Sequence, residues 1–484
     1  MLDSMMDRRT FLASTGGALI APSLGFAASP TSADLSDDIS ILRQALALHP
    51  GLYRYNSPHQ ISDRIDDLAI KFASAPAIDT RYLLLSRFLS TIRCGHSYAN
   101  FFNQKKTVAD ALFDRPTRVP FHFVWVGDEM VVTADHSGTG QLMPGMRVAK
   151  LNGLRPSVIR AALTPYVRAD GHNDVKRRSL LEVQGIDSIE TFDVFQGLLF
   201  PPIGNEHRIE TIRPDGSKTT ISLPTINLSQ RRANTNIKSD GPLWTWAVRP
   251  DGVVVLTMPS WGTYDSKWDW KTWLDDRLNS LSGAKGLVVD IRRNEGGEDC
   301  GDPILARLAA RDLIDAGAQQ RLRFQRTPES IDRYLDTWDN SFRTLGVGAQ
   351  PLPDGFFLRP GANEFLTIAA KAPRLTLPVA ILTSAVNSSA TFQFAQTAQR
   401  YGLARLYGGT TGGNRRGING GCFFFVRLPA SGLEFDLPLV GYFPAVRQPD
   451  DGLVPDARIS PTVADLANDR DPVLTRAVAD IITR

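Results

Sequence analysis

The sequence predicts an α/β fold, because apolar strands alternate with helices along the second half of the chain. Three runs rich in Val, Ile and Leu are typical of buried strands and lie at 253–258, 286–291 and 378–383. A helix with Trp and Leu on one face is expected at 270–281, and Gly402 ends a shorter helix expected at 391–401. We therefore predict a sheet covered by helices across residues 240–475.

The region 36–112 is predicted to be a helical domain. Apolar residues recur there every three or four positions in segments at 39–46, 61–72 and 83–92. The first of these segments ends at His49-Pro50, and the third stops before Gly95.

From residue 115 to about 230 the period of the apolar residues changes to that of strands. One hairpin is expected around Gly127-Asp128 and another around Asp215-Gly216. Between them, the strand at 146–151 leads into an Asn-Gly turn and a helix from Ser157. This order resembles part of a PDZ-like module, so a PDZ-like, β-rich insert is expected here.

Composition excludes several classes of function. The 484 residues carry a net charge of +3 without a basic block, which gives no indication of nucleic-acid binding. No apolar run after the first thirty residues is long enough to cross a bilayer. The three cysteines are widely spaced and odd in number, which favours small buried residues over a disulfide framework or a zinc site.

The first 28 residues are predicted to be an export signal. Arg8-Arg9 precede a weakly apolar stretch, Pro22 breaks it, and small residues follow up to Ala28. This order resembles a twin-arginine signal, and the alternative is a chance Arg pair before a buried helix. We expect the mature chain to begin near Ser29 and to be periplasmic or secreted.

Three polar segments stand where predicted strands or helices end, and they carry the candidate chemistry. The segment 289–297 ends in two glycines whose N–H groups could hold an oxyanion, although a plain turn with an Asp-Arg ion pair would look the same. The segment 387–391 places Ser389 before a helix, where serine is also an ordinary N-cap. The segment 93–97 places His96 directly after a helix end.

Together these segments resemble the serine peptidase family of C-terminal processing proteases, the tricorn protease core and interphotoreceptor retinoid-binding protein. The family pattern has an apolar strand that ends Asp-x-Arg-x-Asn-x-Gly-Gly, then Ser-Ala before a helix, then Gly-x-x-Thr-Gly-Gly, and last Gly-x-x-Pro-Asp. Here these motifs fall at 290–297, 389–390, 408–413 and 452–456. The tricorn-like branch adds Gly-His-Ser/Thr, which is matched at 95–97.

The resemblance implies a ClpP/crotonase-like catalytic domain and a tail-specific type of serine endopeptidase acting on peptides or proteins, with no cofactor and no metal. It implies Ser389 as nucleophile. Backbone N–H groups of Gly296 or Gly297 and of Ala390 would form the oxyanion hole. The chain departs from the family at Glu295, where a small residue is common.

The general base in this family is either a Lys on the nucleophile's domain or a His from elsewhere. The last Lys of the chain is Lys371, before the nucleophile, and arginines stand where the Lys-dependent branch carries its Lys. Because Arg stays protonated, His96 is the predicted base, with a Lys folded back from the N-terminal half as the remaining alternative. Asp450 is the predicted acid that orients it, with Asp451 and Glu434 as alternatives, since strict register places Pro449 there.

Two other functions remain open at this point. A catalytically silent carrier of the same fold could bind an apolar ligand in a pocket lined by Phe423, Phe424 and Phe425, although such a triplet is also typical of a core strand. An interaction module could grip peptide C-termini through the PDZ-like segment. The presence of both Ser389 and His96 favours the enzyme.

Overall fold

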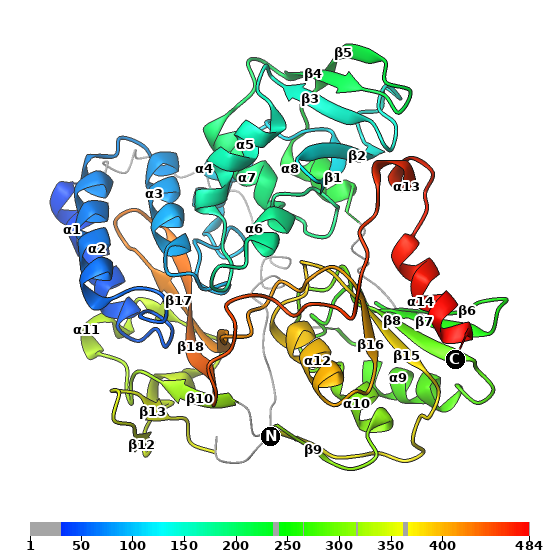
Figure 1. The fold of residues 1–484 in the computed structure, drawn as a ribbon. Helices are drawn as coiled ribbons and strands as arrows, with labels where there is room; N and C mark the ends of the chain where they lie inside the picture. Colours follow the sequence, from blue (N-terminus) through cyan, green and yellow to red (C-terminus); the bar gives the residue numbers. More distant parts are fainter. Residues whose placement is uncertain (1–30, 236–241, 265, 316–317, 362–365, 484) are drawn as a thin grey trace, which may run out of the picture.

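The computed structural model describes residues 31–235, 242–264, 266–315, 318–361 and 366–483. Figure 1 shows a group of N-terminal helices, a β-rich region and a layered α/β region packed together. The predicted mixed α/β class is confirmed. The export signal expected at 1–28 lies outside the described residues.

The α/β region is built on a six-stranded sheet whose order is β19-β16-β15-β8-β7-β6. All neighbours in it are parallel except the edge pair of β6 and β7. Its strands are β6 (Thr245–Val248), β7 (Val253–Thr257), β8 (Gly286–Asp290), β15 (Val379–Thr383), β16 (Arg405–Gly408) and β19 (Ala457–Arg458). The three strands predicted from apolar runs are thus its three adjacent central strands.

Helices cover both faces of this sheet, which explains why its strands are continuously apolar. One face packs against α9 (Trp270–Asn279), α10 (Asp302–Leu308) and α12 (Ser389–Arg400), and the other against α14 (Pro472–Ile482). Alternate residues of one strand serve the two sides: Val254 and Leu256 face the first core, whereas Val253 and Val255 face the second.

The β-rich region contains a five-stranded antiparallel sheet in sequence order. Its strands are β1 (Phe121–Val126), β2 (Glu129–Asp135), β3 (Arg147–Leu151), β4 (Glu206–Ile212) and β5 (Lys218–Pro224). Both predicted hairpins are present, with Gly127 and Gly216 at positive φ in their turns. The helices of this region are α5 (Pro156–Leu163), α6 (Asp174–Leu180), α7 (Thr191–Leu199) and α8 (Leu228–Ala233). The sheet is compatible with a PDZ-like module, which stays a prediction.

The N-terminal helices are α1 (Ser32–Leu46), α2 (Pro58–Ser74), α3 (Ile78–Ser90) and α4 (Lys106–Phe113). Thr31 and Ser57 begin the first two with capping boxes, in which the side chain binds the N3 amide and the N3 side chain binds back. Apolar residues at helical spacing, such as Ile61, Ile65 and Leu68 of α2, form the buried face.

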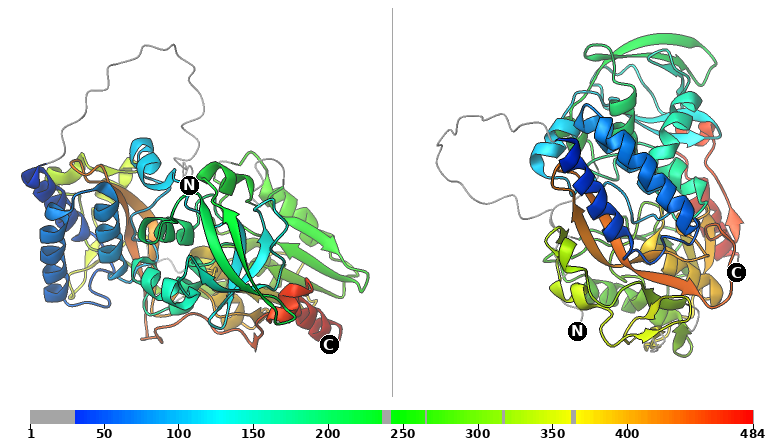
Figure 2. Two further views of the ribbon diagram at one scale, coloured as in Figure 1. Left: turned by 90° about the horizontal axis from the view of Figure 1, so that it is seen from above. Right: turned by 90° about the vertical axis from the view of Figure 1, so that its left-hand side faces the viewer.

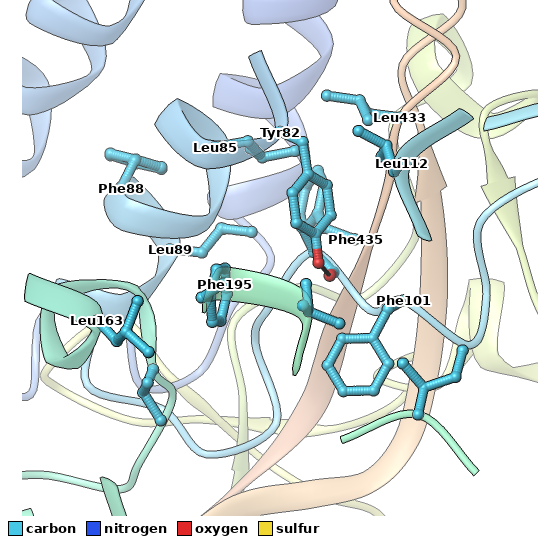
Figure 3. Close-up of a cluster of buried hydrophobic side chains, with 14 of the residues drawn as sticks. Tyr82, Leu85, Phe88, Leu89, Phe101, Leu112, Leu163, Phe195, Leu433 and Phe435 are labelled. Carbon is cyan, nitrogen blue, oxygen red and sulfur yellow. Dashed lines mark hydrogen bonds between the residues drawn. The ribbon is translucent and has the colours of Figure 1, made fainter. Parts of the chain in front are cut away.

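A second six-stranded sheet, in the order β11-β17-β18-β10-β13-β12, packs against these helices, as Figure 1 and Figure 2 show. Its strands are β10 (Ala318–Leu322), β11 (Leu335–Asp336), β12 (Gln350–Pro351), β13 (Phe357–Leu358), β17 (Asn419–Arg427) and β18 (Glu434–Pro444). The shared core joins Tyr82 and Leu85 of α3 to Leu433 and Phe435, as Figure 3 shows. The region 240–475, expected as one domain, therefore contributes strands to two sheets.

Short elements complete the described chain: η2 (Thr164–Tyr166), β9 (Leu313–Asp315), α11 (Glu329–Asp332), η3 (Asn340–Thr344), β14 (Leu366–Ile368) and α13 (Val463–Ala467). The three cysteines, Cys94, Cys300 and Cys422, are buried and unpaired, as predicted. Within the described ranges, no helix is long and apolar enough to cross a membrane.

Candidate active site

The topology of the central sheet brings two of the three polar segments together. β8 and β15 are parallel neighbours, with Asp290 opposite Leu382. The segments that follow them, 291–297 and 384–389, therefore leave the same edge of the sheet. This is the edge at which open parallel sheets carry their sites.

The buried side chain of Asn387 ties the two segments to each other. Its amide Nδ2 donates to the carbonyl oxygens of Ile291 at 2.5 Å and Asn294 at 3.0 Å. The Thr391 hydroxyl donates to the same Asn294 oxygen at 3.1 Å. These bonds satisfy buried backbone groups and fix the turn that precedes α12.

The remaining two motifs support this turn from the other side. The N–H groups of Gly412 and Gly413 donate to the Asn387 carbonyl at 2.6 and 3.0 Å. Thr411 in turn exchanges backbone and hydroxyl bonds with Leu453 of the Gly-x-x-Pro-Asp segment. Motifs that are far apart in the sequence thus meet around one residue.

Ser389 occupies a strained position at the start of α12. Its φ is +50°, in the left-handed region that residues with a side chain rarely adopt. The helix N-cap is Ser388, and its hydroxyl forms no capping bond but donates to the Glu295 carbonyl at 3.1 Å. The alternative was that the serines here only cap the helix. The structure does not support it, because Ser388 forms no capping bond. A strained serine between a strand and a helix is a geometry known from nucleophiles.

Gly296 of the first motif lies directly against Ser389, and the neighbouring Gly297 packs against the Trp261 backbone. A methyl group on Gly296 would lie 2.9 Å from Ser389 Cβ, and Gly296 and Gly297 have φ of +120° and +137°. The Gly296 N–H donates to Asn294 Oδ1 at 2.9 Å, so it is engaged within its own loop. Gly297 and Ala390, which lies in the first turn of α12, remain the predicted oxyanion donors.

His96 stands on a rigid turn after α3. The Gly95 N–H donates to Asp170 Oδ1 at 2.8 Å, and a methyl group on Gly95 would lie 2.7 Å from Asp170 Oδ2. On the other side, the Ser97 hydroxyl is 2.8 Å from Nε2 of the buried His49. Burial lowers the pKa of His49 to about 3, so this supporting histidine is neutral.

Burial and four neighbouring charges act in opposite directions on the pKa of His96. Burial lowers its pKa below the ordinary histidine value, which keeps the imidazole neutral near pH 7. Asp170 and Glu295 act to raise the His96 pKa, whereas Arg168 and Lys176 act to lower it. Its Nδ1 atom is buried and has no hydrogen-bond partner among the described residues.

The predicted contact between His96 and Asp450 is not present. Asp450 instead accepts from the His172 backbone N–H at 3.2 Å and from Asn414 Nδ2 at 2.8 Å, and its Oδ2 bonds His172 Nδ1. The loop that carries Asp450 is thus turned toward His172, which is half exposed. The two alternatives are also used elsewhere, since Asp451 pairs with an arginine of the 414–416 turn and Glu434 with one of β17.

A partly buried ion cluster surrounds Glu295, and it was not predicted from the sequence. Lys176 Nζ lies 2.7 Å from Glu295 Oε1, and Arg168 Nη2 lies 3.2 Å from Glu295 Oε2. Burial raises the pKa of Glu295, but the two cations outweigh it and lower that pKa to about 2. A Lys from the N-terminal half does fold back: burial lowers the pKa of Lys176 whereas Glu295 acts to raise it, and its Nζ is engaged with Glu295 and the Val386 carbonyl. The signal in the sequence was Glu295 itself, since a partly buried carboxylate is stabilised by cations.

The phenylalanine triplet divides between core and site. Phe424 is fully buried, whereas Phe423 and Phe425 are half-buried and contact Trp338. The Phe423 ring centre is 5.8 Å from that of His96. Among the described residues, no group of three or more His, Cys, Asp or Glu side chains could hold a metal ion.

Residues 252–421 match the model of peptidase family S41. This segment has the sequence pattern of an S41 serine peptidase. The match contains the loop of Gly296 and Gly297 and the turn of Ser389, and it ends inside β17. It leaves out the segment of His96 and the closing segment of Asp450.

Structures of CPAF show the same overall fold as this chain. Mature CPAF, mature CPAF complexed with lactacystin and a CPAF mutant give TM-scores of 0.62 to 0.64 at 12 to 14% identity. The alignments cover 93 to 94% of this chain and 98 to 99% of the CPAF chains. No curated protein sequence matches the chain.

Proposed function

We propose that this chain is an exported endopeptidase that cleaves peptide bonds with Ser389 as nucleophile and His96 as base. The observation that carries the proposal is the strained Ser389 beside Gly296, with a neutral His96 held near the same loop. Arg168 links the two, because it bonds both the Gly95 carbonyl and Glu295.

The chemistry follows from these groups. His96 Nε2 accepts the Ser389 hydroxyl proton as Oγ attacks the scissile carbonyl carbon, and N–H groups of Gly297 and Ala390 receive the developing oxyanion. The imidazolium then returns the proton to the leaving amine, which leaves an acyl ester on Ser389. Water, deprotonated by the neutral His96, hydrolyses this ester and restores the enzyme.

Labelling with a fluorophosphonate tests the proposal. We expect one label per chain, located on Ser389 by peptide mapping, and a loss of both labelling and casein hydrolysis in Ser389→Ala. Ser388→Ala is the matched control and should keep both, because Ser388 contributes only one bond to a backbone carbonyl. His96→Ala should slow labelling about 10²- to 10⁴-fold.

The same experiment separates the enzyme from a silent carrier. A carrier of this fold would give no label on Ser389 and no hydrolysis in the wild type. A label on another serine would show that the nucleophile is misassigned. Lactacystin, the compound complexed with CPAF in one of the similar structures, provides a second probe that should compete with the phosphonate.

Export is proposed from the sequence of the first 28 residues. The twin-arginine pattern rests on Arg8 and Arg9 followed by an apolar stretch and small residues. Changing both arginines to lysine should leave the precursor in the cytoplasm, whereas the wild type should yield a mature form beginning near Ser29. Mature-length protein outside the cytoplasm in the double variant would refute the twin-arginine route.

A further inference from the structure

Three loops make up the proposed active site, and each comes from a different part of the chain. Gly95 and His96 follow α3, Glu295 and Gly296 follow β8, and 386–389 follows β15. The β-rich region contributes none of the reacting groups. Yet its segment 168–176 contacts all three loops.

Arg168 connects the first loop to the second. Its Nη1 donates to the Gly95 carbonyl oxygen at 2.8 Å, and its Nη2 donates to Glu295 Oε2 at 3.2 Å. The guanidinium also lies over the Tyr98 ring, 4.4 Å from its centre. A planar fork with several donors can bind two acceptors in fixed directions, which a lysine ammonium cannot reproduce.

Lys176 connects the second loop to the third. Its Nζ lies 2.7 Å from Glu295 Oε1 and donates to the Val386 carbonyl oxygen at 2.8 Å. Val386 is three residues before Ser389. The Lys176 side chain is only 3% exposed, so its charge depends on the Glu295 carboxylate for compensation.

Asp170 adds a further contact between this segment and the His96 loop. Asp170, between the two cations in sequence, accepts the Gly95 N–H, so both polar groups of Gly95 are held by this one segment. Glu295 is the residue at which the two cationic side chains meet.

We propose that Arg168 and Lys176, acting through Glu295, are positioning residues that hold His96 and Ser389 in register, so that the β-rich region completes the active site. This inference rests on the proposed function of those two residues. None of the three touches the reacting atoms. Separating the segment 168–176 from Glu295 would free the base loop from the nucleophile loop.

Four charged groups act on His96, and removing an acidic or a basic one should shift the pKa of His96 in opposite directions. Activity falls at low pH when His96 becomes protonated, and this part of the pH–rate profile is its acid limb. Removing the negative charge of Glu295 lowers the pKa of His96, so Glu295→Gln should move the acid limb to lower pH. Removing the positive charge of Arg168 raises it, so Arg168→Met should move the limb to higher pH. The other two charged groups, Asp170 and Lys176, are not substituted in either variant.

The kinetic test uses three variants. Arg168→Met and Arg168→Lys should each lower kcat about 10²-fold with KM changed less than about threefold, because misplacement of reacting groups by about 1 Å costs that much. Arg168→Lys keeps the charge and should leave the acid limb in place, which separates positioning from electrostatics. Glu295→Gln replaces the carboxylate with an uncharged amide of the same shape, so this variant should fold.

Matched controls come from an ion pair whose hydrogen bonds, among the described residues, involve none of the three catalytic loops. Arg343 binds the Asp332 carboxylate at 2.5 Å and the Leu335 carbonyl at 2.6 Å, and its exposure resembles that of Arg168. Arg343→Met and Asp332→Asn should leave kcat and the acid limb unchanged. Equal losses in these controls would show a general effect on folding and overturn the inference.

A readout independent of hydrolysis keeps this inference distinct from the proposed function. The pKa of His96 can be followed by NMR of ¹³C-labelled histidine in the inactive Ser389→Ala protein, with His96→Ala for assignment. It should fall in Glu295→Gln and rise in Arg168→Met. Unchanged values, or shifts of the same sign, would overturn the inference even if the wild type proved to be an active peptidase.

Discussion

The backbone of Ser389 allows a direct test on stability. At φ +50° a residue with a Cβ atom costs about 1–2 kcal/mol. Ser389→Gly removes that cost, but glycine loses about 0.5–1 kcal/mol more than alanine through its freedom in the unfolded chain. Ser389→Ala keeps the strain. The glycine variant should therefore be the more stable one, by about 0.7 kcal/mol within a range of about 0–1.5 kcal/mol.

Urea unfolding followed by tryptophan fluorescence measures this difference, with both variants inactive. Ser40 is the control, because it is an exposed serine in the interior of α1 with ordinary helical backbone. There the order should reverse, and Ser40→Gly should be less stable than Ser40→Ala by about 1 kcal/mol. If alanine were the more stable residue at position 389 as well, Ser389 would not be strained and the argument from its geometry would fail.

Three further predictions concern neighbouring groups. Gly296→Ala should lower kcat/KM at least about 10²-fold, since the new methyl would meet the nucleophile at 2.9 Å, whereas Gly420→Ala, with open space around it, should have no effect. Asp170→Asn should move the acid limb to lower pH, because Asp170 raises the pKa of His96. Burial raises the pKa of Glu190 to about 8, so stability should fall as pH rises from about 4.5 to about 8, and Glu190→Gln should raise Tm at pH 8 but not at pH 4.

The sequence predicted the central sheet and the meeting of its motifs for a physical reason. Buried parallel strands are continuously apolar, and their carboxyl ends lie at one edge. Polar segments after β8 and β15 were therefore expected to meet, and Asn387 is the residue that joins them.

The carboxylate near His96 was harder to predict. Asp450 sits in the expected segment, but its side chain binds His172 and Asn414 rather than His96. Arg168 and Lys176 carry no motif, and they reach Glu295 across 127 and 119 positions of sequence. Such contacts depend on how the regions pack, which local periodicity does not encode.

The second sheet shows the same limit. β17 was indicated only by an aromatic triplet and β18 was not predicted, and the packing of these strands against the N-terminal helices joins residues more than three hundred positions apart. In β17, buried residues alternate with more exposed ones, which gives a weaker pattern than the continuously buried strands of the central sheet.

The pH dependence of kcat/KM for a peptide substrate tests the central claim most directly, because it reports the pKa of the base in the free enzyme. Since burial lowers the pKa of His96, activity should be constant near neutral pH and fall tenfold per unit only below a midpoint under 6.5. His96→Ala should lose that limb together with most of the rate. A rate that instead rises into the alkaline range and survives in His96→Ala would assign the base to a lysine such as Lys176 and contradict the account.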